Sequence, residues 1–378
     1  MRNVVCGLIG LLCLAACGGG SSGGAGFQND PTPPSPYAPL GNYMGIAYGD
    51  LGQPMGLTQS YPSSFWPSNL PAFQIAYGSD DESAIANLSA LVHLKRSICS
   101  ATPVYYDSRS NTTFLIGAAH CFVTSKSSPT ILSRNDLMAA SDVRIYHGVG
   151  SSLHSWDANY DVKAIYLRQD YCYNGSFATD GECQNFTPQE GASGGQGNDI
   201  AIIQVVGQYA DPESYPQIVP ATQYPQSYTM APVLSIGYGI NTQTPIGDMP
   251  SGCTVGSDCA VMYYTANYQY WQQDTIGYHY LYNSYYNNGG FGQYGYTSLI
   301  CGGDSGGGDL FWNGSHWLLL SEHTYGPSDV CGTFYNFLPD GSTNVSAYYD
   351  WVQSILYSTD PVAACNNGGI ANCVTNGI

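Results

Sequence analysis

From about Ala84 onward the chain is a succession of short apolar runs separated by turn residues, and this pattern restricts the possible folds more than any other feature of the sequence. Short strand-forming runs bounded by Gly, Pro, Asn, Asp and Ser are typical of all-β proteins. Near the end, by contrast, residues 345–356 have apolar side chains at helical spacing. The sequence therefore predicts an all-β fold that closes with a C-terminal helix. We expect its strands at residues 88–98, 113–119, 143–146, 162–166 and 317–321.

One stretch, Cys-Gly-Gly-Asp-Ser-Gly-Gly at residues 301–307, has the composition of a tight turn that presents a nucleophile. Glycines let the backbone bend sharply and direct two N–H groups into one small hollow, and Ser305 would attack a carbonyl group there. A nucleophilic serine needs a base within hydrogen-bond reach and a carboxylate that orients this base. His120, in Ala-Ala-His-Cys, and Asp199, in Asn-Asp-Ile-Ala, each lie beside an apolar run typical of a buried strand. We therefore expect these three side chains to act together.

The three motifs, in the order His, Asp, Ser, resemble those of the chymotrypsin/trypsin family of serine endopeptidases. The resemblance covers about residues 84–357, and it implies a further strand at residues 332–335, where Gly-Thr-Phe-Tyr resembles the family's Gly-Val-Tyr strand. It implies two Greek-key six-stranded β-barrels, at about 84–225 and 230–345, followed by the closing helix. A chain of 378 residues is long enough for two such barrels. It also implies hydrolysis of peptide bonds through an acyl-enzyme.

The resemblance implies a role for each residue of these motifs. His120 is the general base, Asp199 orients its imidazole, and Ser305 is the nucleophile. The backbone N–H groups of Gly303 and Ser305 form the oxyanion hole. The carboxylate of Asp304 anchors the active-site loop.

The resemblance further indicates which residues line the specificity pocket, S1. The residue six positions before the nucleophile forms its floor, and here this residue is Leu299, followed by Ile300. A leucine offers no partner to a Lys or Arg side chain, and burying an unpaired charge is costly. On the wall, Ser321, Glu322 and His323 replace the family's Ser-Trp-Gly. We expect an apolar preference if His323 narrows the pocket; a protonated His323 would select glutamate instead, unless Glu322 neutralises it.

The cysteines indicate an oxidising compartment. Of the 13 cysteines, Cys6, Cys13 and Cys17 belong to the N-terminal segment, which leaves ten, an even number. None of these has the Cys-x-x-Cys spacing of a structural zinc site, so we expect no metal and no cofactor. We expect five disulfides, the first two implied by the resemblance and the other three by proximity alone: Cys99–Cys121, Cys301–Cys331, Cys172–Cys183, Cys253–Cys259 and Cys365–Cys373.

The N-terminal residues 1–16 are typical of an export signal, with a positive charge followed by a short apolar core. Leu-Ala-Ala-Cys at residues 14–17 resembles the lipobox of bacterial lipoproteins, in which Cys17 becomes the lipidated first residue. Residues 17–71, rich in Gly, Pro and Ser, would then form a tether or pro-segment. This predicts an outer-membrane or cell-surface lipoprotein; ordinary secretion after cleavage near Ala16 is the alternative. The protease domain spans residues 72–357, and residues 358–378 form a disulfide-containing tail.

The charge distribution excludes one class of partner and one route of activation. Lys and Arg number 9 against 27 Asp and Glu, a formal net charge of −18, which disfavours nucleic acid. We expect a protein or peptide substrate, membrane contact only through a lipid anchor, and a monomer. Tryptic activation is excluded because no Lys or Arg lies between Arg2 and Lys95. In one alternative, the enzyme folds directly into its active form, and the carboxylate of Asp304 is bound by another cation or by hydrogen bonds instead of a new N-terminal ammonium. In the other, the chain is cut at a non-basic site, such as the one before Ile75.

Two other functions use the same residues differently. A surface-anchored binding protein or adhesin could be built on an inactive protease scaffold, because a fold does not dictate function. An esterase could use the same triad, although the Gly-x-Ser-x-Gly here does not lie between an obvious strand and helix, as a hydrolase elbow requires. The intact motifs favour the endopeptidase over both.

Overall fold

The computed structural model describes thirteen segments of the chain, all within one compact unit, Pro34–Ile378. No helix in these segments is long and apolar enough to cross a membrane. The segments are residues 86–95, 97–124, 131–148, 158–172, 176–177, 183–184, 198–223, 231–239, 263–270, 280–284, 302–313, 316–325 and 340–377.

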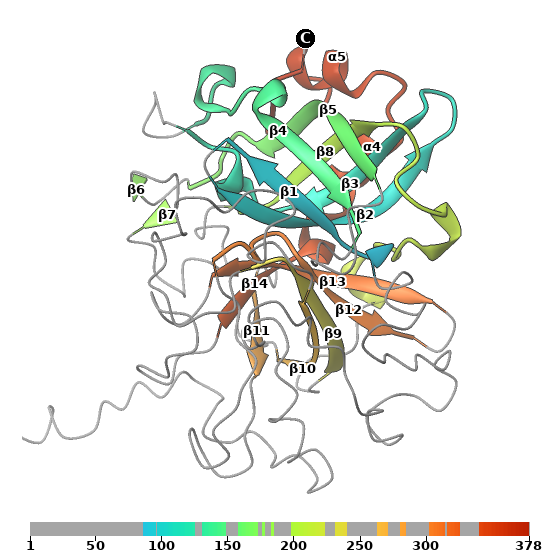
Figure 1. The fold of residues 1–378 in the computed structure, drawn as a ribbon. Coiled ribbons are helices and arrows are strands. Elements are labelled where there is room, and N and C mark those ends of the chain that lie inside the picture. The colour runs from blue at the N-terminus through green and yellow to red at the C-terminus, as the bar shows by residue number, and fades with distance from the viewer. Residues whose placement is uncertain are drawn as a thin grey trace, which may run out of the picture. The chain divides into compact units, whose positions relative to one another are not determined.

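A seven-stranded antiparallel sheet contains the strands around the candidate histidine and aspartate (Figure 1). Its order is β15-β5-β4-β1-β2-β3-β8, and β5 also pairs with β8. The pairings therefore run from β5 through β4, β1, β2, β3 and β8 back to β5. Leu115, Ile165 and Ile203 fill its interior and are fully buried. The strands are β1 (Ala90–Leu94), β2 (Ile98–Asp107), β3 (Thr112–Gly117), β4 (Val143–His147), β5 (Ala158–Arg168), β8 (Ala201–Val206) and β15 (Cys373–Thr375).

A closed six-stranded barrel contains the strands that flank the candidate nucleophile, coloured from olive to red in Figure 1. The barrel order is β10-β11-β14-β13-β12-β9, all antiparallel. A pair of two-residue strands, β6 (Ser176–Phe177) and β7 (Cys183–Gln184), lies outside both sheets. The barrel strands are β9 (Ala231–Gly237), β10 (Tyr263–Tyr270), β11 (Tyr280–Ser284), β12 (Gly308–Trp312), β13 (Trp317–Tyr325) and β14 (Asp340–Asn344).

The predicted C-terminal helix is confirmed, but its first turn is tighter than an α-helix. The 3₁₀ helix η8 (Val345–Tyr348) precedes the α-helix α4 (Tyr349–Leu356). The side chain of Asn344 accepts a hydrogen bond from the backbone N–H of Ser346, which fixes the start of this turn. Trp351, together with Phe114 of β3, belongs to one apolar cluster that also includes residues of β9 and β12. The helix thus joins the core of the first sheet to that of the barrel.

Other short elements connect the strands. The 3₁₀ helices are η3 (Ala119–Cys121), η4 (Arg134–Asp136), η5 (Ala140–Asp142), η6 (Pro212–Ser214) and η7 (Ala221–Gln223), and one more α-helix, α5 (Pro361–Asn366), follows α4.

The expectation of a mostly β fold with a short C-terminal helix is confirmed, and one predicted strand is wrong in detail. Residues 88–98 were expected to form a single strand, but β1 ends at Leu94 and β2 begins at Ile98. The backbone N–H of Leu94 donates to the carbonyl of Ser97 at 2.9 Å, closing a tight turn. The polar residues at 95–97 interrupt the apolar run and favour this turn. The strand expected at 332–335 lies outside the described residues.

The tail after Tyr357 is an integral part of the first sheet. β15 pairs with β5, and the predicted bridge Cys365–Cys373 links α5 to β15. The side chain of Asn376 accepts from the backbone N–H of Ile165 at 2.8 Å and donates to the carbonyl of Met138 at 2.7 Å. The tail therefore adds one strand to the sheet, and the side chain of Asn376 bonds both β5 and the segment between η4 and η5.

The disulfide expectations are confirmed where the structure describes both cysteines. Cys99–Cys121 and Cys365–Cys373 are both formed. Cys172 is disulfide-bonded. The side chain of Cys183, its expected partner, is not among those that the structure describes. The expected bridges Cys253–Cys259 and Cys301–Cys331 also fall outside it.

Candidate active site

His120 and Asp199 form a doubly hydrogen-bonded pair at the edge of the first sheet. His120 lies on η3, directly after β3, and Asp199 lies just before β8. The backbone N–H of His120 donates to Oδ1 of Asp199 at 2.8 Å, and Nδ1 of the imidazole lies 2.8 Å from Oδ2. A carboxylate can only accept, so Nδ1 carries the hydrogen. The pair fixes the tautomer in which Nε2 is the basic nitrogen.

Asp199 is held in place by its neighbour Asn198. Asn198 has a left-handed backbone, φ 50°, which Asn tolerates better than most residues. Its side chain donates to the carbonyl of Asp170 at 3.1 Å and accepts from the hydroxyl of Tyr348 at 3.0 Å. Burial raises the pKa of Tyr348, so this hydroxyl stays a donor at neutral pH. Asn198 is therefore hydrogen-bonded both to the segment that directly follows β5 and to η8.

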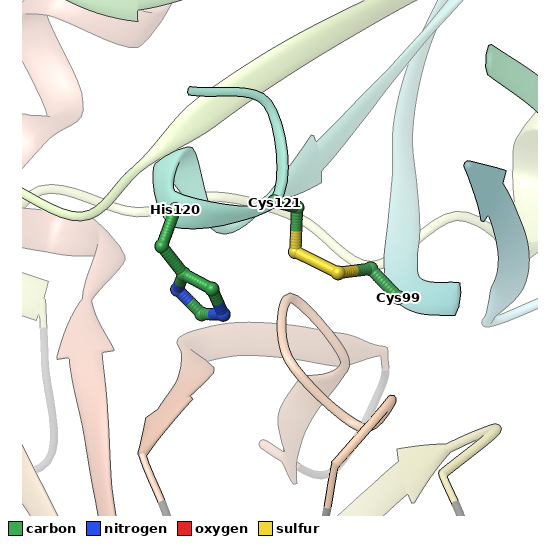
Figure 2. Close-up of side chains that lie close together, drawn as sticks. All are labelled: Cys99, His120 and Cys121. Atoms are coloured by element: carbon green, nitrogen blue, oxygen red, sulfur yellow. A yellow bond between two sulfur atoms is a disulfide. The ribbon is translucent and has the colours of Figure 1, made fainter. Parts of the chain in front are cut away.

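The Cys99–Cys121 disulfide lies beside His120, as Figure 2 shows. The two sulfur atoms and one ring nitrogen lie within 4.8 Å of one another, a spacing that could hold a metal ion. However, a cysteine binds a metal as a thiolate, and these sulfurs are bonded to each other. The Cys99–Cys121 disulfide links β2 covalently to η3 and so helps to position His120.

Ser305 sits on a turn whose shape only glycines allow at two positions. Gly303 and Gly306 have φ values of +100° and +85°, in the left-handed region. A Cβ on Gly306 would lie 2.3 Å from the carbonyl oxygen of Ser100. A hydrogen bond of 2.8 Å from the N–H of Gly307 to the carbonyl of Asp304 closes the turn. The Gly-Asp-Ser-Gly-Gly motif is thus required by backbone geometry and close contact.

The turn is attached to the first sheet through Ser100 of β2. The backbone N–H of Ser100 donates to the carbonyl of Ser305 at 2.8 Å, and its hydroxyl donates to the carbonyl of Gly303 at 2.9 Å. The same hydroxyl accepts from the N–H of Tyr238 at 2.9 Å. In addition, Sγ of Cys121 lies 3.9 Å from the carbonyl oxygen of Ser305. The candidate nucleophile is therefore positioned next to the turn that carries the histidine.

Asp304 is fully buried and its carboxylate is bound by the barrel. Oδ1 accepts from the backbone N–H of Gly239 at 2.7 Å. A Cβ on Gly237 would lie 2.1 Å from Oδ1, and one on Gly239 would lie 2.5 Å from the carboxyl carbon. The carboxylate fits only because both residues are glycines. The carboxylate of Asp304 thus accepts a hydrogen bond, which is one of the two partners expected for it if the enzyme folds directly into its active form. Ile75, the alternative new N-terminus, lies outside the described residues.

The residues expected in the specificity pocket fall into two groups. Leu299 and Ile300 lie outside the described residues. Ser321 and His323 lie on β13, are fully buried, and both contact Asp309 of β12. The partner of His323 is thus Asp309 rather than its neighbour in sequence.

Glu322 lies between these two residues on β13 and is also fully buried. Its Oε1 accepts from the hydroxyl of Thr324 at 3.3 Å, and its Oε2 has no hydrogen-bond partner in the described segments. Burial raises the pKa of Glu322 well above its usual range, and the negative charge of Asp199 adds to the effect. Burial therefore favours the neutral form of this carboxyl group, and the carboxylate that lies close to His323 is that of Asp309.

Three residues of the site were not identified in the sequence. Ser100 directly follows a cysteine expected to form a bridge, and Asn198 precedes the candidate aspartate, so both lie next to recognised motifs. Asp309 is an acid inside an apolar strand, a pattern that itself indicates a buried, hydrogen-bonded carboxylate. The spacing along the chain gave no hint that Asp309 would meet His323.

Comparison with known proteins adds little. No family model and no curated protein matches the sequence. Among solved structures, the chain is similar to the scabies mite inactivated protease paralogue S-D1, with 16% sequence identity and a TM-score of 0.42 over 72% of this chain and 94% of that one. The function must therefore be inferred from the residues of the site itself.

Proposed function

We propose that this protein is an exported serine endopeptidase that uses Ser305, His120 and Asp199 as its catalytic triad. The observation that carries the proposal is the doubly bonded His120–Asp199 pair, with distances of 2.8 Å, beside a glycine turn that carries a serine. A pair that merely stabilised the fold would not require a neighbouring nucleophile on a turn. Fixing Nε2 as the basic nitrogen is what a general base for Ser305 requires.

In the proposed reaction, Oγ of Ser305 attacks the carbonyl carbon of the substrate while its proton moves to Nε2 of His120. The carboxylate of Asp199 stabilises the imidazolium. The carbon–nitrogen bond then breaks, and the leaving nitrogen takes the proton from Nε2. Water attacks the resulting acyl-enzyme, gives a proton to His120, and releases the acid as the proton returns to Ser305.

The N–H groups of Gly303 and Ser305 would hold the oxyanion that forms in both steps. Each such donor is worth about 2.7–4 kcal/mol in the transition state. The support for this assignment is the set of bonds that hold the turn: Ser100 binds the carbonyls of Gly303 and Ser305, and Asp304 is bound by Gly239. A preorganised turn is what makes these donors effective, because no reorganisation is needed during the reaction.

The proposed fold is the two-barrel architecture of the chymotrypsin/trypsin family. The closed barrel is its second half. The ring of pairings through β5, β4, β1, β2, β3 and β8 supports a first six-stranded barrel, to which the tail adds β15. The proposed active site then lies where η3 from the first half meets the Ser305 turn from the second.

We propose an apolar S1 preference rather than one for Lys, Arg or Glu. Leu299 offers no partner to a positive charge. His323, the residue that would select glutamate, has its Nε2 3.0 Å from a carboxylate oxygen of Asp309, and both side chains are fully buried. A protonated His323 would thus be neutralised inside the barrel. The N-terminal segment supports export with a lipid anchor on Cys17, and the net charge of −18 supports a peptide substrate over nucleic acid.

The test is labelling of the purified protein with a fluorophosphonate probe, followed by profiling of cleavage sites in a peptide library. We expect labelling and peptide cleavage, both abolished in Ser305→Ala, which should remain folded because the hydroxyl contributes to chemistry rather than packing. A folded wild-type protein that neither reacts nor cleaves would support the binding-protein alternative. A top rate for Arg or Lys would contradict the apolar preference, as would a glutamate preference that His323→Ala removes.

N-terminal sequencing of active protein tests export and activation together. A mature start at Cys17 would support lipidation and direct folding into the active form. A start at Ile75 would instead show activation by cleavage at a non-basic site.

A further inference from the structure

The interior of the closed barrel holds a polar cluster centred on the carboxylate of Asp309. Oδ2 accepts from the hydroxyls of Ser321 at 2.7 Å and Ser342 at 2.9 Å. Oδ1 accepts from the hydroxyl of Ser235 and lies 3.0 Å from Nε2 of His323. The five residues come from β9, β12, β13 and β14, and none is more than 1% exposed. A single carboxylate on β12 thus binds donors from three other strands of the barrel.

This cluster is not the simplest way to fill a barrel. Burial alone would raise the pKa of the Asp309 carboxyl, but the charge and hydrogen bond of His323, with the hydroxyls of Ser235 and Ser321, lower it below its ordinary value. The carboxylate is therefore ionised inside the core. Replacing such a buried pair by apolar residues of similar volume often leaves stability unchanged or increases it. Stability alone is thus a weak reason for the cluster.

The cluster is directly connected to the turn that carries Ser305. The backbone N–H of His323 donates to the carbonyl of Gly307 at 2.8 Å, and the N–H of Gly306 donates to the carbonyl of His323 at 2.8 Å. A Cβ on Gly307 would lie 3.1 Å from Nδ1 of His323, so the imidazole also packs closely against the turn. The residue that Asp309 holds by its side chain is therefore the residue that holds the turn by its backbone.

Asp309 also follows this turn closely in sequence. Only Gly308 separates it from Gly307, and it is the second residue of β12. The register of β12 and β13 shifts directly after Asp309, between Asp309 and Leu310. The side chain that the cluster holds therefore lies at the irregularity between the Ser305 turn and the rest of β12.

We propose that Asp309 and His323 are positioning residues for Ser305. The Asp309 carboxylate fixes the His323 imidazole, and the His323 backbone in turn fixes Gly306 and Gly307. This keeps the Ser305 hydroxyl and the N–H groups of Gly303 and Ser305 in reactive geometry. The inference rests on the proposed function for its catalytic consequence, but the structural coupling between the cluster and the turn does not depend on it.

The variants Asp309→Asn and His323→Leu test the proposal. A catalytic group displaced by about 1 Å loses up to about 100-fold in rate, so we expect kcat to fall about tenfold to 100-fold with KM nearly unchanged, and fluorophosphonate labelling to slow equally. His323→Gln keeps an N–H donor for Asp309 and should recover part of the loss. Ser342→Ala removes only one donor to Asp309 and should lower kcat in the same way but by less. It tests the proposal even if Asp309→Asn does not fold.

The matched control is Tyr166→Phe in the first sheet. It removes a buried hydrogen bond of 2.7 Å from the Tyr166 hydroxyl to Gln204, away from the turn. We expect it to lower the unfolding temperature without changing kcat. If the Asp309 and His323 variants behave in the same way, with lower stability and unchanged kcat, the cluster is purely structural and the proposal is wrong.

Hydrogen exchange separates this proposal from the proposed function. Amides of residues 302–307 should exchange faster in Asp309→Asn and Ser342→Ala than in Tyr166→Phe, whether or not the protein cleaves peptides. Unchanged exchange there would overturn the coupling. An unreactive wild-type protein with faster exchange in the variants would refute the endopeptidase and retain the coupling.

Discussion

The described segments contain two carboxylate–imidazole pairs, one at the edge of the first sheet and one inside the closed barrel, which differ in exposure and in the ring nitrogen that lies near the carboxylate. In the first, Nδ1 of His120 lies 2.8 Å from Asp199, and the side chains are 11% and 3% exposed. In the second, Nε2 of His323 lies 3.0 Å from Asp309, and both side chains are 0% exposed. The same chemical pair thus occurs at an edge that can meet a substrate and inside a barrel that cannot.

The difference shows what a pair needs in order to catalyse. Asp199 bonds both the ring and the backbone of His120, and in the proposed mechanism Nε2 of that ring transfers the proton. Asp309 lies close to Nε2 of His323 and also accepts hydrogen bonds from three hydroxyl groups, all inside the barrel. In the proposed function the more exposed first pair transfers a proton, whereas the fully buried second pair holds the turn in place.

The largest expected effect separates the two aspartates. Asp199→Asn places an amide donor where Nδ1–H needs an acceptor, which favours the wrong tautomer, and such a change lowers kcat about 10⁴-fold. Asp309→Asn should cost at most about 100-fold. Steady-state rates of both variants at neutral pH check this. Equal losses would mean that the two pairs do not have the different roles proposed here.

The second largest expected effect on reactivity concerns Gly306, in the backbone of the Ser305 turn. Gly306→Ala should slow labelling more than about 100-fold, because its Cβ would lie 2.3 Å from the Ser100 carbonyl at φ +85°. Gly368→Ala is the matched control: its φ is +73°, but nothing lies within 4 Å of its Cβ. It should lose only about 1 kcal/mol of stability and keep full labelling. Similar loss of labelling in both variants would attribute the effect to backbone strain alone.

A smaller effect is expected at Ser100 of β2, which binds the Ser305 turn through the carbonyls of Gly303 and Ser305. Ser100→Ala leaves the carbonyl of Gly303 and the N–H of Tyr238 without this hydroxyl. An unpaired buried group costs about 1–3 kcal/mol, and we expect kcat to fall about tenfold as the oxyanion donors loosen. Ser89→Ala, which removes a 3.4 Å bond to the carbonyl of Ala101, should leave kcat unchanged. Unchanged kcat in Ser100→Ala would show that Asp309 and His323 suffice to hold the turn.

The first pair and the Ser305 turn could be located from the sequence because their motifs are local. Ala-Ala-His-Cys, Asn-Asp-Ile-Ala and Gly-Asp-Ser-Gly-Gly contain the residues that the geometry uses, including the glycines with positive φ. The strands could be predicted for the same reason, since apolar runs and turn residues are local signals. The break at Leu94 was missed because three polar residues did not outweigh the apolar residues on both sides.

The second pair could not be found in this way, because it forms only when strands distant in sequence pair. Asp309 meets Ser235 through the pairing of β12 with β9, and Ser342 through β13 and β14. The position of His323 in a motif indicates a pocket wall, but it does not indicate the contact of its side chain with Asp309 inside the barrel. A motif gives the order of residues along a strand, whereas the register between strands decides which side chains meet.

The smallest expected effect concerns Glu322, a buried carboxyl that, unlike the two aspartates, has no imidazole partner in the described segments. Because burial raises its pKa above the ordinary value of 4.5, the folded state binds a proton that the unfolded state releases as the pH rises. Stability is therefore lost with rising pH, by about 1.4 kcal/mol per pH unit between the unfolded and folded pKa values. Glu322→Gln removes this dependence.

Thermal unfolding of Glu322→Gln and wild type at several pH values provides the measurement. We expect similar midpoints at about pH 4, where the carboxyl is protonated in both states, and a higher midpoint for the variant at about pH 7. Asp309 has the opposite sign: its pKa is lowered on folding, so its contribution is present above its ordinary value of 3.8 and is lost as the pH falls through the folded pKa. A wild-type protein as stable as the variant at about pH 7 would mean that Glu322 is ionised, and a second negative charge would then lie near Asp199.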